Sequence, residues 1–329
     1  MKILYGMGNR YGGNLILSRF LSNTKHEVKI AAWNKSSYTL KKVDWLFDGI
    51  FYNLVKIRTA QDDIDVHGYK GYYVWNHNMP YFVQDLLDFG PDLVICDDDL
   101  YTAHFANSFN IPLWYCSPLL LVRGMEKDSF FYKEYCKLFA NKHHSKYPFP
   151  PADKYLIYHP FGDIKFRPIL REGFEWIKPY HLDIPEKEII YDNLFLSHDL
   201  ERNKILEKLC KSIPHSIFQN PEYIGQSKKI LITGDTSHLS DAFYAGKIIS
   251  VAPRTTEEKT RRTVKNWTDT EGLLNAILVK EYSIGENYGQ IEFMENYATS
   301  ELLKKFYYKE DYLSIQKTKY LHEMVEDFA

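Results

Sequence analysis

A run of small polar residues stands between two short apolar segments in ILITGDTSHLSDAFYAGKIISVAP, residues 230–253. The apolar segments predict strands, and the residues from Ser240 to Ala245 predict the opening of a helix between them. A polar turn before a helix presents free backbone N–H groups and small hydroxyls, which suit a phosphate group. We therefore predict a phosphate site at four residues of this turn: Gly234, Thr236, Ser237 and His238.

Two further positions in this half of the chain could contact the same ligand. Asp241, inside the predicted helix, could bind a ribose hydroxyl, or it could complement the helix dipole. Ser197 and His198 follow the predicted strand 189–196, at the edge where doubly wound sheets bind ligands; the alternative is a solvated turn. Together these residues indicate a ligand linked to a nucleotide.

Acidic residues follow a buried strand in the first half of the chain. The strand 92–96 is followed directly by Asp97, Asp98 and Asp99. A carboxylate at the carboxyl end of such a strand could remove a hydroxyl proton as a general base, and we favour Asp98. The alternative is a solvated loop with one helix N-cap. His77, in WNHN, is a second candidate base.

A glycine-rich turn, in MGNRYGGN, follows the first predicted strand. Glycines allow close approach of the backbone to a ligand, and an arginine could meet a charged group. The predicted ligand-facing residues of this turn are Gly8, Arg10, Gly12, Gly13 and Asn14.

Apolar runs alternate with segments of helical periodicity along the chain, which is typical of α/β proteins. The strands predicted in the first half are 3–7, 26–32, 72–75, 92–96, 111–116 and 155–159. Those of the second half are 189–196, 215–219, 229–232 and 248–252. We predict an α/β protein of two facing, doubly wound Rossmann-like domains, at 1–180 and 181–290, followed by C-terminal helices at 291–329.

The composition narrows the function classes. A net charge of -2 over 329 residues indicates no strong global attraction to nucleic acid or anionic membrane. The four cysteines have no metal-type spacing, and we expect no metal or other cofactor. We find neither a signal peptide nor an apolar segment of membrane-spanning length, which predicts a cytoplasmic protein.

The chain resembles the GT-B glycosyltransferases, which have two facing Rossmann-like domains. The resemblance rests on MGNRYGGN, HEVKIAA and GPDLVICDDDLYTAHFANSFNIPLWYCSP in the first half and on TGDTSHLSDAFYAGKIISVAP in the second. It implies a nucleotide-sugar donor, most commonly a UDP-sugar, held by the second domain. The acceptor hydroxyl would lie on the first domain, and the last helices would cross back to that domain.

Two positions depart from the family pattern. Asn14 stands where many members have a histidine base, so a carboxylate is the expected base. A glutamine that contacts sugar hydroxyls is also missing after the donor motif. Glu257 and Glu258 stand nearby as candidate replacements, or they belong to a charged surface helix.

The sequence leaves the acceptor open between a cell-envelope saccharide or lipid and hydroxymethylated phage DNA. A basic and aromatic stretch at 304–320 could bind nucleic acid, although we favour a helix that packs on the first domain. Two alternatives to a glycosyltransferase also stay open: a UDP-sugar 2-epimerase, which needs no acceptor, and a non-catalytic nucleotide-sugar-binding protein.

Overall fold

The computed structural model describes residues 1–7, 17, 19–32, 51–53, 83–126, 150–164, 167–196, 215–216, 221–232, 234–251, 255–259, 264–268, 270–281, 285–287 and 318–329. For a few residues within these helices and strands, only the backbone is described.

The first half of the chain forms a parallel sheet of seven strands, in the order β3-β2-β1-β4-β5-β6-β7. In this order the strands are Phe51–Asn53, Glu27–Ala32, Lys2–Met7, Leu93–Asp97, Leu113–Cys116, Lys154–Tyr158 and Phe174–Ile177. The central strand β4, LVICD, is buried along its whole length, as expected where helices cover both faces of a parallel sheet.

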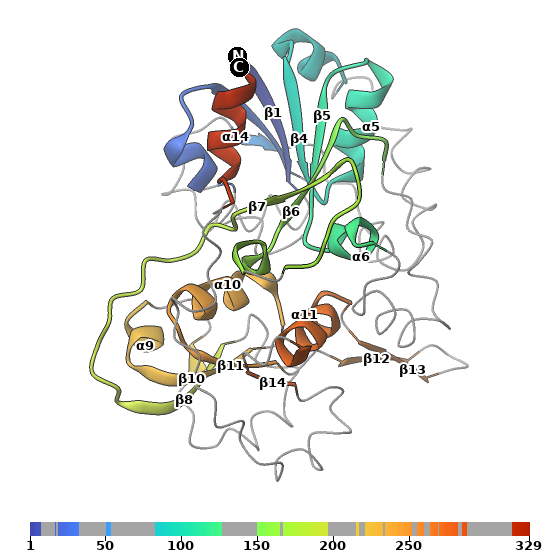
Figure 1. Ribbon diagram of the computed structural model, residues 1–329. Helices are drawn as coiled ribbons and strands as arrows, with labels where there is room; N and C mark the ends of the chain where they lie inside the picture. The colour runs from blue at the N-terminus through green and yellow to red at the C-terminus, as the bar shows by residue number, and fades with distance from the viewer. Residues whose placement is uncertain are drawn as a thin grey trace.

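Helices cover the two faces of this sheet. The helices α5 (Leu100–Ser108) and α6 (Leu120–Gly124) pack on one face. The other face receives α14 (Leu321–Phe328), whose Leu321, Met324 and Val325 pack with core residues of the sheet. The ring of Phe328 lies 5.2 Å from that of Trp114 on β5. In Figure 1, α14 lies beside β1 and the two chain ends meet.

The second half forms a parallel sheet of five strands, in the order β14-β11-β10-β8-β9. These are Gly285–Asn287, Ile248–Val251, Ser227–Ile232, Tyr191–Leu196 and His215–Ser216. Its helices are α9 (Pro221–Gly225), α10 (Thr236–Tyr244) and α11 (Thr270–Glu281). Residues 178–190, which contain no helix or strand, connect the two sheets (Figure 1).

The predicted fold class, with two doubly wound sheets and a C-terminal helix returning to the first, is confirmed. Three expectations need correction or lie outside the described residues. The helix expected from Ser240 begins at Thr236, because Asp235 caps it. Glu257 and Glu258 lie in a hairpin of β12 (Thr255–Lys259) and β13 (Val264–Thr268), so the surface-helix alternative is wrong. Of the C-terminal helices expected at 291–329, only residues from 318 onward are described.

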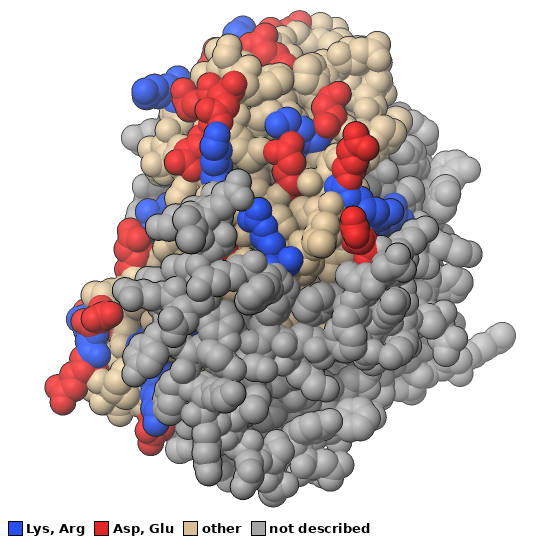
Figure 2. Space-filling view, viewed as in Figure 1, with Lys and Arg blue, Asp and Glu red and all other residues tan. Residues whose placement is uncertain are grey.

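Charged side chains are mixed in sign over the visible described surface (Figure 2). No described helix combines the length and the apolar character that crossing a bilayer requires.

Candidate active site

The turn between β10 and α10 lies at the carboxyl end of the second sheet. Asp235 caps α10, with its carboxylate accepting from the backbone N of His238 at 3.3 Å. The same carboxylate accepts from Ser237 Oγ at 2.8 Å and lies 2.9 Å from His238 Nδ1. Ser237 and His238, which the sequence singled out, therefore form one hydrogen-bonded unit with Asp235 around a helix N-terminus.

The first turn of α11 lies directly against this unit. Gly234 has φ +100°, and a Cβ placed on it would lie 2.4 Å from the Cα of Gly272. The neighbouring Glu271 accepts a hydrogen bond from the backbone N of Thr236 at 2.8 Å through Oε1. A carboxylate oxygen of Glu271 therefore accepts from an N–H group at the start of α10, and the N-terminus of a helix favours negative charge.

His159 joins the first sheet to this turn. It follows β6, is fully buried, and accepts from the backbone N of Phe161 at Nδ1, over 3.3 Å. This bond assigns the proton to Nε2, which donates to Asn275 Oδ1 over 2.7 Å. The Asn275 amide donates in turn to the Gly234 carbonyl at 2.5 Å and to Thr236 Oγ1 at 3.2 Å. The turn between β10 and α10 is thus tied to the carboxyl end of β6 through the side chains of His159, Asn275 and Thr236.

Burial lowers the pKa of His159 from 6.5 to about 4, so the folded protein holds it neutral. The unfolded chain takes up this proton as the pH falls below 6.5, whereas the folded state takes it up only near 4. Unfolding free energy should therefore fall across this window, by about 3 kcal/mol in total. Urea unfolding of wild type and His159→Gln at several pH values measures this contribution. The variant should show a shallower dependence, and equal slopes would contradict the assignment.

A second buried link joins the two halves nearby. Tyr244 on α10 donates to Asp163 Oδ2 at 2.7 Å, from the short helix η3 (Pro160–Asp163). The other Asp163 oxygen accepts from the backbone N of Thr318 at 2.9 Å and from its hydroxyl at 2.5 Å. Burial, and then the Asp163 charge, raise the pKa of Tyr244, which keeps it a neutral donor. This link holds α10, the first sheet and the C-terminal segment together.

Asp241 lies on α10, but its side chain forms its hydrogen bond away from the turn between β10 and α10. Its side chain is fully buried, and Oδ1 accepts from the backbone N of Leu182 at 2.8 Å. A ribose contact through this carboxylate would require the connection at Leu182 to move. In the structure Asp241 holds the connection between the sheets, and its position in the second turn also separates it from the helix end.

The three consecutive acids at the carboxyl end of β4 have different surroundings. Asp97 is buried, and its Oδ1 accepts from Tyr158 OH at 2.9 Å. Asp99 is buried too and caps α5 by accepting from the Thr102 hydroxyl and, at 3.2 Å, from its backbone N. Asp98 is only half-buried and has φ 53°, a left-handed conformation that is uncommon for a residue other than glycine. The alternative considered from the sequence, that one of these acids is a helix N-cap, therefore holds for Asp99.

Neutral groups surround the Asp97 carboxylate. Burial, and then the charge of Asp97, raise the pKa of both the Tyr5 hydroxyl and the Cys116 thiol. Both groups therefore keep their protons at neutral pH, and the thiol is buried and unreactive. The carboxyl ends of β1, β4, β5 and β6 thus place one acidic cluster in a largely apolar setting.

Several predicted site residues lie outside the described residues: His77, Gly8, Arg10, Gly12, Gly13, Asn14, Ser197 and His198. The side chains of Glu257 and Glu258 are also outside the description, although their strand is defined. Their proposed roles stay predictions.

Sequence reasoning missed four residues of the site: Asp235, His159, Glu271 and Asn275. His159 could have been found, because it is the last residue of the predicted strand 155–159, at the edge of the sheet where Asp97 also lies. Asp235 has the side chain and position of an N-cap. Glu271 and Asn275 carry no comparable signal, since their roles arise only when α11 packs beside α10.

No protein-family model matches this chain, and neither does any curated protein. Solved structures are similar over nearly the whole chain. The calicheamicin glycosyltransferase CalG4 is 14% identical with a TM-score of 0.55, covering 91% of this chain and 90% of its own. The spinosyn forosaminyltransferase SpnP is 10% identical with a TM-score of 0.53, covering 94% and 88%.

A third similar structure is the glycosyltransferase SsfS6 of Streptomyces sp. SF2575, complexed with thymidine diphosphate. It is 13% identical with a TM-score of 0.51, and the match covers 91% of each chain. The expected resemblance is confirmed in the arrangement of both sheets: this chain has the fold of the GT-B glycosyltransferases.

Proposed function

We propose that this protein is a glycosyltransferase that moves a sugar from a nucleotide-sugar to an acceptor hydroxyl. The observation that carries the proposal is the α10 N-terminus. There the backbone N of Thr236 donates a hydrogen bond to a carboxylate oxygen of Glu271. Asn275 connects the same helix end to His159, at the carboxyl end of the first sheet. The fold similarity to glycosyltransferases across both halves supports the same function.

In the proposed reaction, N–H and hydroxyl groups of Thr236 and Ser237 bind the donor diphosphate. The Asp98 carboxylate takes the proton of the acceptor hydroxyl, while the oxygen of that hydroxyl bonds to the anomeric carbon of the sugar. The bond from that carbon to the diphosphate oxygen breaks, and its electron pair leaves with the nucleoside diphosphate. Positive charge at the start of α10 stabilises this leaving group.

For the donor we propose a UDP-sugar, and for the acceptor a saccharide or lipid hydroxyl. A DNA acceptor would call for a basic face that contacts phosphates, whereas the net charge of -2 gives the chain no overall basic character.

Calorimetric titration with UDP, TDP, GDP and ADP tests donor recognition, with uridine as the phosphate-free control. We expect UDP to bind most tightly and uridine to bind weakly. Mass spectrometry with UDP-sugars then tests transfer to candidate acceptors. Conversion of the donor to its epimer without acceptor would favour an epimerase, binding without turnover a non-catalytic protein, and absence of any nucleotide binding would contradict all three.

Replacing Glu271 with Gln should strengthen binding of the nucleoside diphosphate. In wild type, the donor phosphate must compete with the Glu271 carboxylate for the Thr236 N–H. Removing one negative charge beside the phosphate should tighten binding by about tenfold, or about 1.4 kcal/mol. Uridine affinity should stay unchanged. Weaker or equal diphosphate binding by the variant would show that Glu271 does not face the phosphate.

A further inference from the structure

A cavity of about 470 Å³ lies at the outer edge of the first sheet, at strand β7. Its apolar wall consists of Pro168, Ile169, Leu170, Phe174 and Trp176, and its polar lining of Arg167, Glu175 and Thr318. A small-molecule site has this size and this mainly apolar and aromatic lining. None of these residues belongs to α10 or α11, the helices of the proposed donor site.

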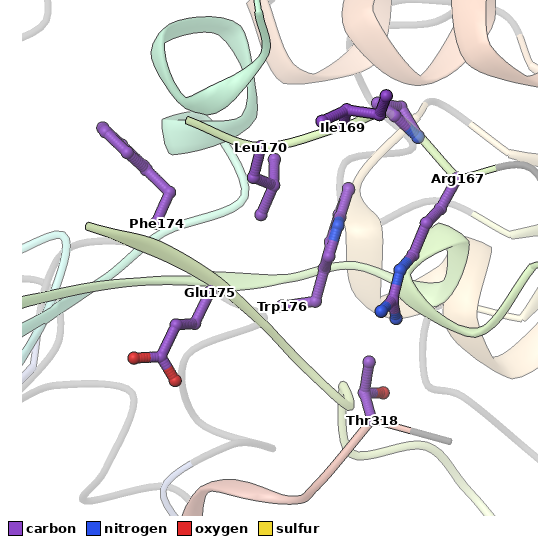
Figure 3. Close-up of a pocket in the computed structure, with 8 residues that line it drawn as sticks. Arg167, Ile169, Leu170, Phe174, Glu175, Trp176 and Thr318 are labelled. Carbon is purple, nitrogen blue, oxygen red and sulfur yellow. The ribbon is translucent and has the colours of Figure 1, made fainter. Parts of the chain in front are cut away.

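Three segments build this cavity, of which the first two are neighbours in the sequence and the third lies far from them. The first is the stretch 167–170, whose end pairs with Met125 after α6 through Leu170. The second is β7, and the third is the segment that begins at Thr318. In Figure 3 the indole of Trp176 stands between the side chains of Leu170 and Arg167. The cavity is therefore formed only in the folded chain.

Arg167 is the cationic group of this cavity. Its Nη1 donates to the carbonyl of Gly162 over 2.6 Å, which fixes the guanidinium in place. Within the described part of the chain, Arg167 forms no ion pair. The Glu175 carboxylate is engaged elsewhere, 3.3 Å from Lys154 Nζ, and points away from the indole in Figure 3. A fixed guanidinium with N–H groups to spare thus lies beside an apolar, aromatic wall.

The geometry points to a binding site for a small amphipathic anion, with an apolar ring against Trp176 and a carboxylate or similar group on Arg167. Guanidinium groups bind carboxylates through parallel hydrogen bonds, and this attraction strengthens where apolar side chains exclude water. Leu170, Ile169 and Pro168 offer the ring apolar surface but no hydrogen bonds.

The surroundings of the cavity connect it to the junction of the two sheets. A Cβ placed on Gly162 would lie within 3.3 Å of both Trp176 and Thr318, so these side chains pack on the η3 backbone. Thr318 also binds Asp163, the partner of Tyr244 on α10. An occupant would therefore brace residues that link the first sheet to α10, and its binding should raise the resistance of the whole protein to unfolding.

The test compares two probes of similar shape by calorimetric titration, the anion 2-naphthoate and the neutral 2-naphthalenemethanol. Wild type should bind 2-naphthoate about tenfold more tightly than the alcohol. Arg167→Gln should remove that preference. Ile169→Asp, at a residue that is 68% exposed, should weaken binding of both probes about tenfold without unfolding the protein.

Ile190→Asp is the matched control, because Ile190 is 60% exposed on the connection between the sheets and does not line the cavity. It should leave both affinities unchanged. The proposal would be overturned if Arg167→Gln kept the wild-type preference for 2-naphthoate over the alcohol. It would also be overturned if Ile169→Asp left both affinities unaffected, or if wild type did not bind 2-naphthoate. Nucleotide titrations do not enter this comparison, so its outcome is independent of the proposed transferase activity.

Discussion

Asp98→Asn is expected to slow sugar transfer by about 10²–10⁴-fold, the usual effect of losing a general base. Of the three acids at the carboxyl end of β4, Asp98 is the one that is neither fully buried nor the cap of α5. Its left-handed backbone at a strand end is a strained geometry of the kind found at active sites. Asparagine keeps the shape but cannot accept the acceptor's proton. Initial rates of transfer, with donor affinity measured separately, test the role.

The neighbouring acids provide matched controls. Asp99→Asn should retain the cap of α5 and cost little unfolding free energy, because asparagine caps a helix about as well as aspartate, and it should change the rate less than Asp98→Asn. Asp97→Asn keeps an acceptor for the Tyr158 hydroxyl and should change the rate less than Asp98→Asn. If Asp98→Asn keeps the wild-type rate, Asp98 is not the base, and the variant that does lose transfer identifies the next candidate.

Gly234→Ala is expected to destabilise the protein by about 3 kcal/mol or more and to abolish nucleotide binding. The backbone at φ +100° disfavours a side chain, and the added Cβ would overlap the Gly272 backbone, which cannot rotate away. Relief requires α11 to separate from the turn, which would break the Asn275 bonds to Gly234 and Thr236. Urea unfolding measures the loss, and calorimetry with UDP measures binding.

Gly173→Ala separates the cost of the left-handed backbone conformation from the cost of the contact with Gly272. Gly173 has φ +84°, but a Cβ there would meet nothing within 4 Å. It should therefore show the conformational penalty alone, about 1 kcal/mol, and retain nucleotide binding. Equal destabilisation by the two substitutions would mean that contact with Gly272 does not matter.

The sheets could be predicted because buried parallel strands leave a plain signal. LVICD and the run before Gly234 are apolar on both faces, and a parallel sheet covered by helices requires this. The hairpin β12–β13 has no such signal: TTEEK is entirely polar, so its strand conformation depends on pairing with Val264–Thr268. The strand β7 was also missed, because FEWI is short and lies at a sheet edge.

The candidate site could be predicted where one residue and its strand were enough. Asp97, Asp98 and the turn at Gly234 follow apolar runs, so their place at the sheet edges follows from the sequence. The roles of Asp241 and Glu271 depend on contacts with chain segments 59 and 35 residues away, at Leu182 and Thr236. No local pattern encodes such contacts.

The return of α14 to the first sheet sets an order of events during synthesis. All seven strands of that sheet leave the ribosome before residues 321–328 exist, and the second sheet is made in between. Until then, the face containing Ile3 and Trp114 lacks the cover that Leu321 and Val325 later provide. The nascent chain therefore carries this apolar face without the cover of α14, as a surface open to chaperones or self-association, through the synthesis of its entire second half.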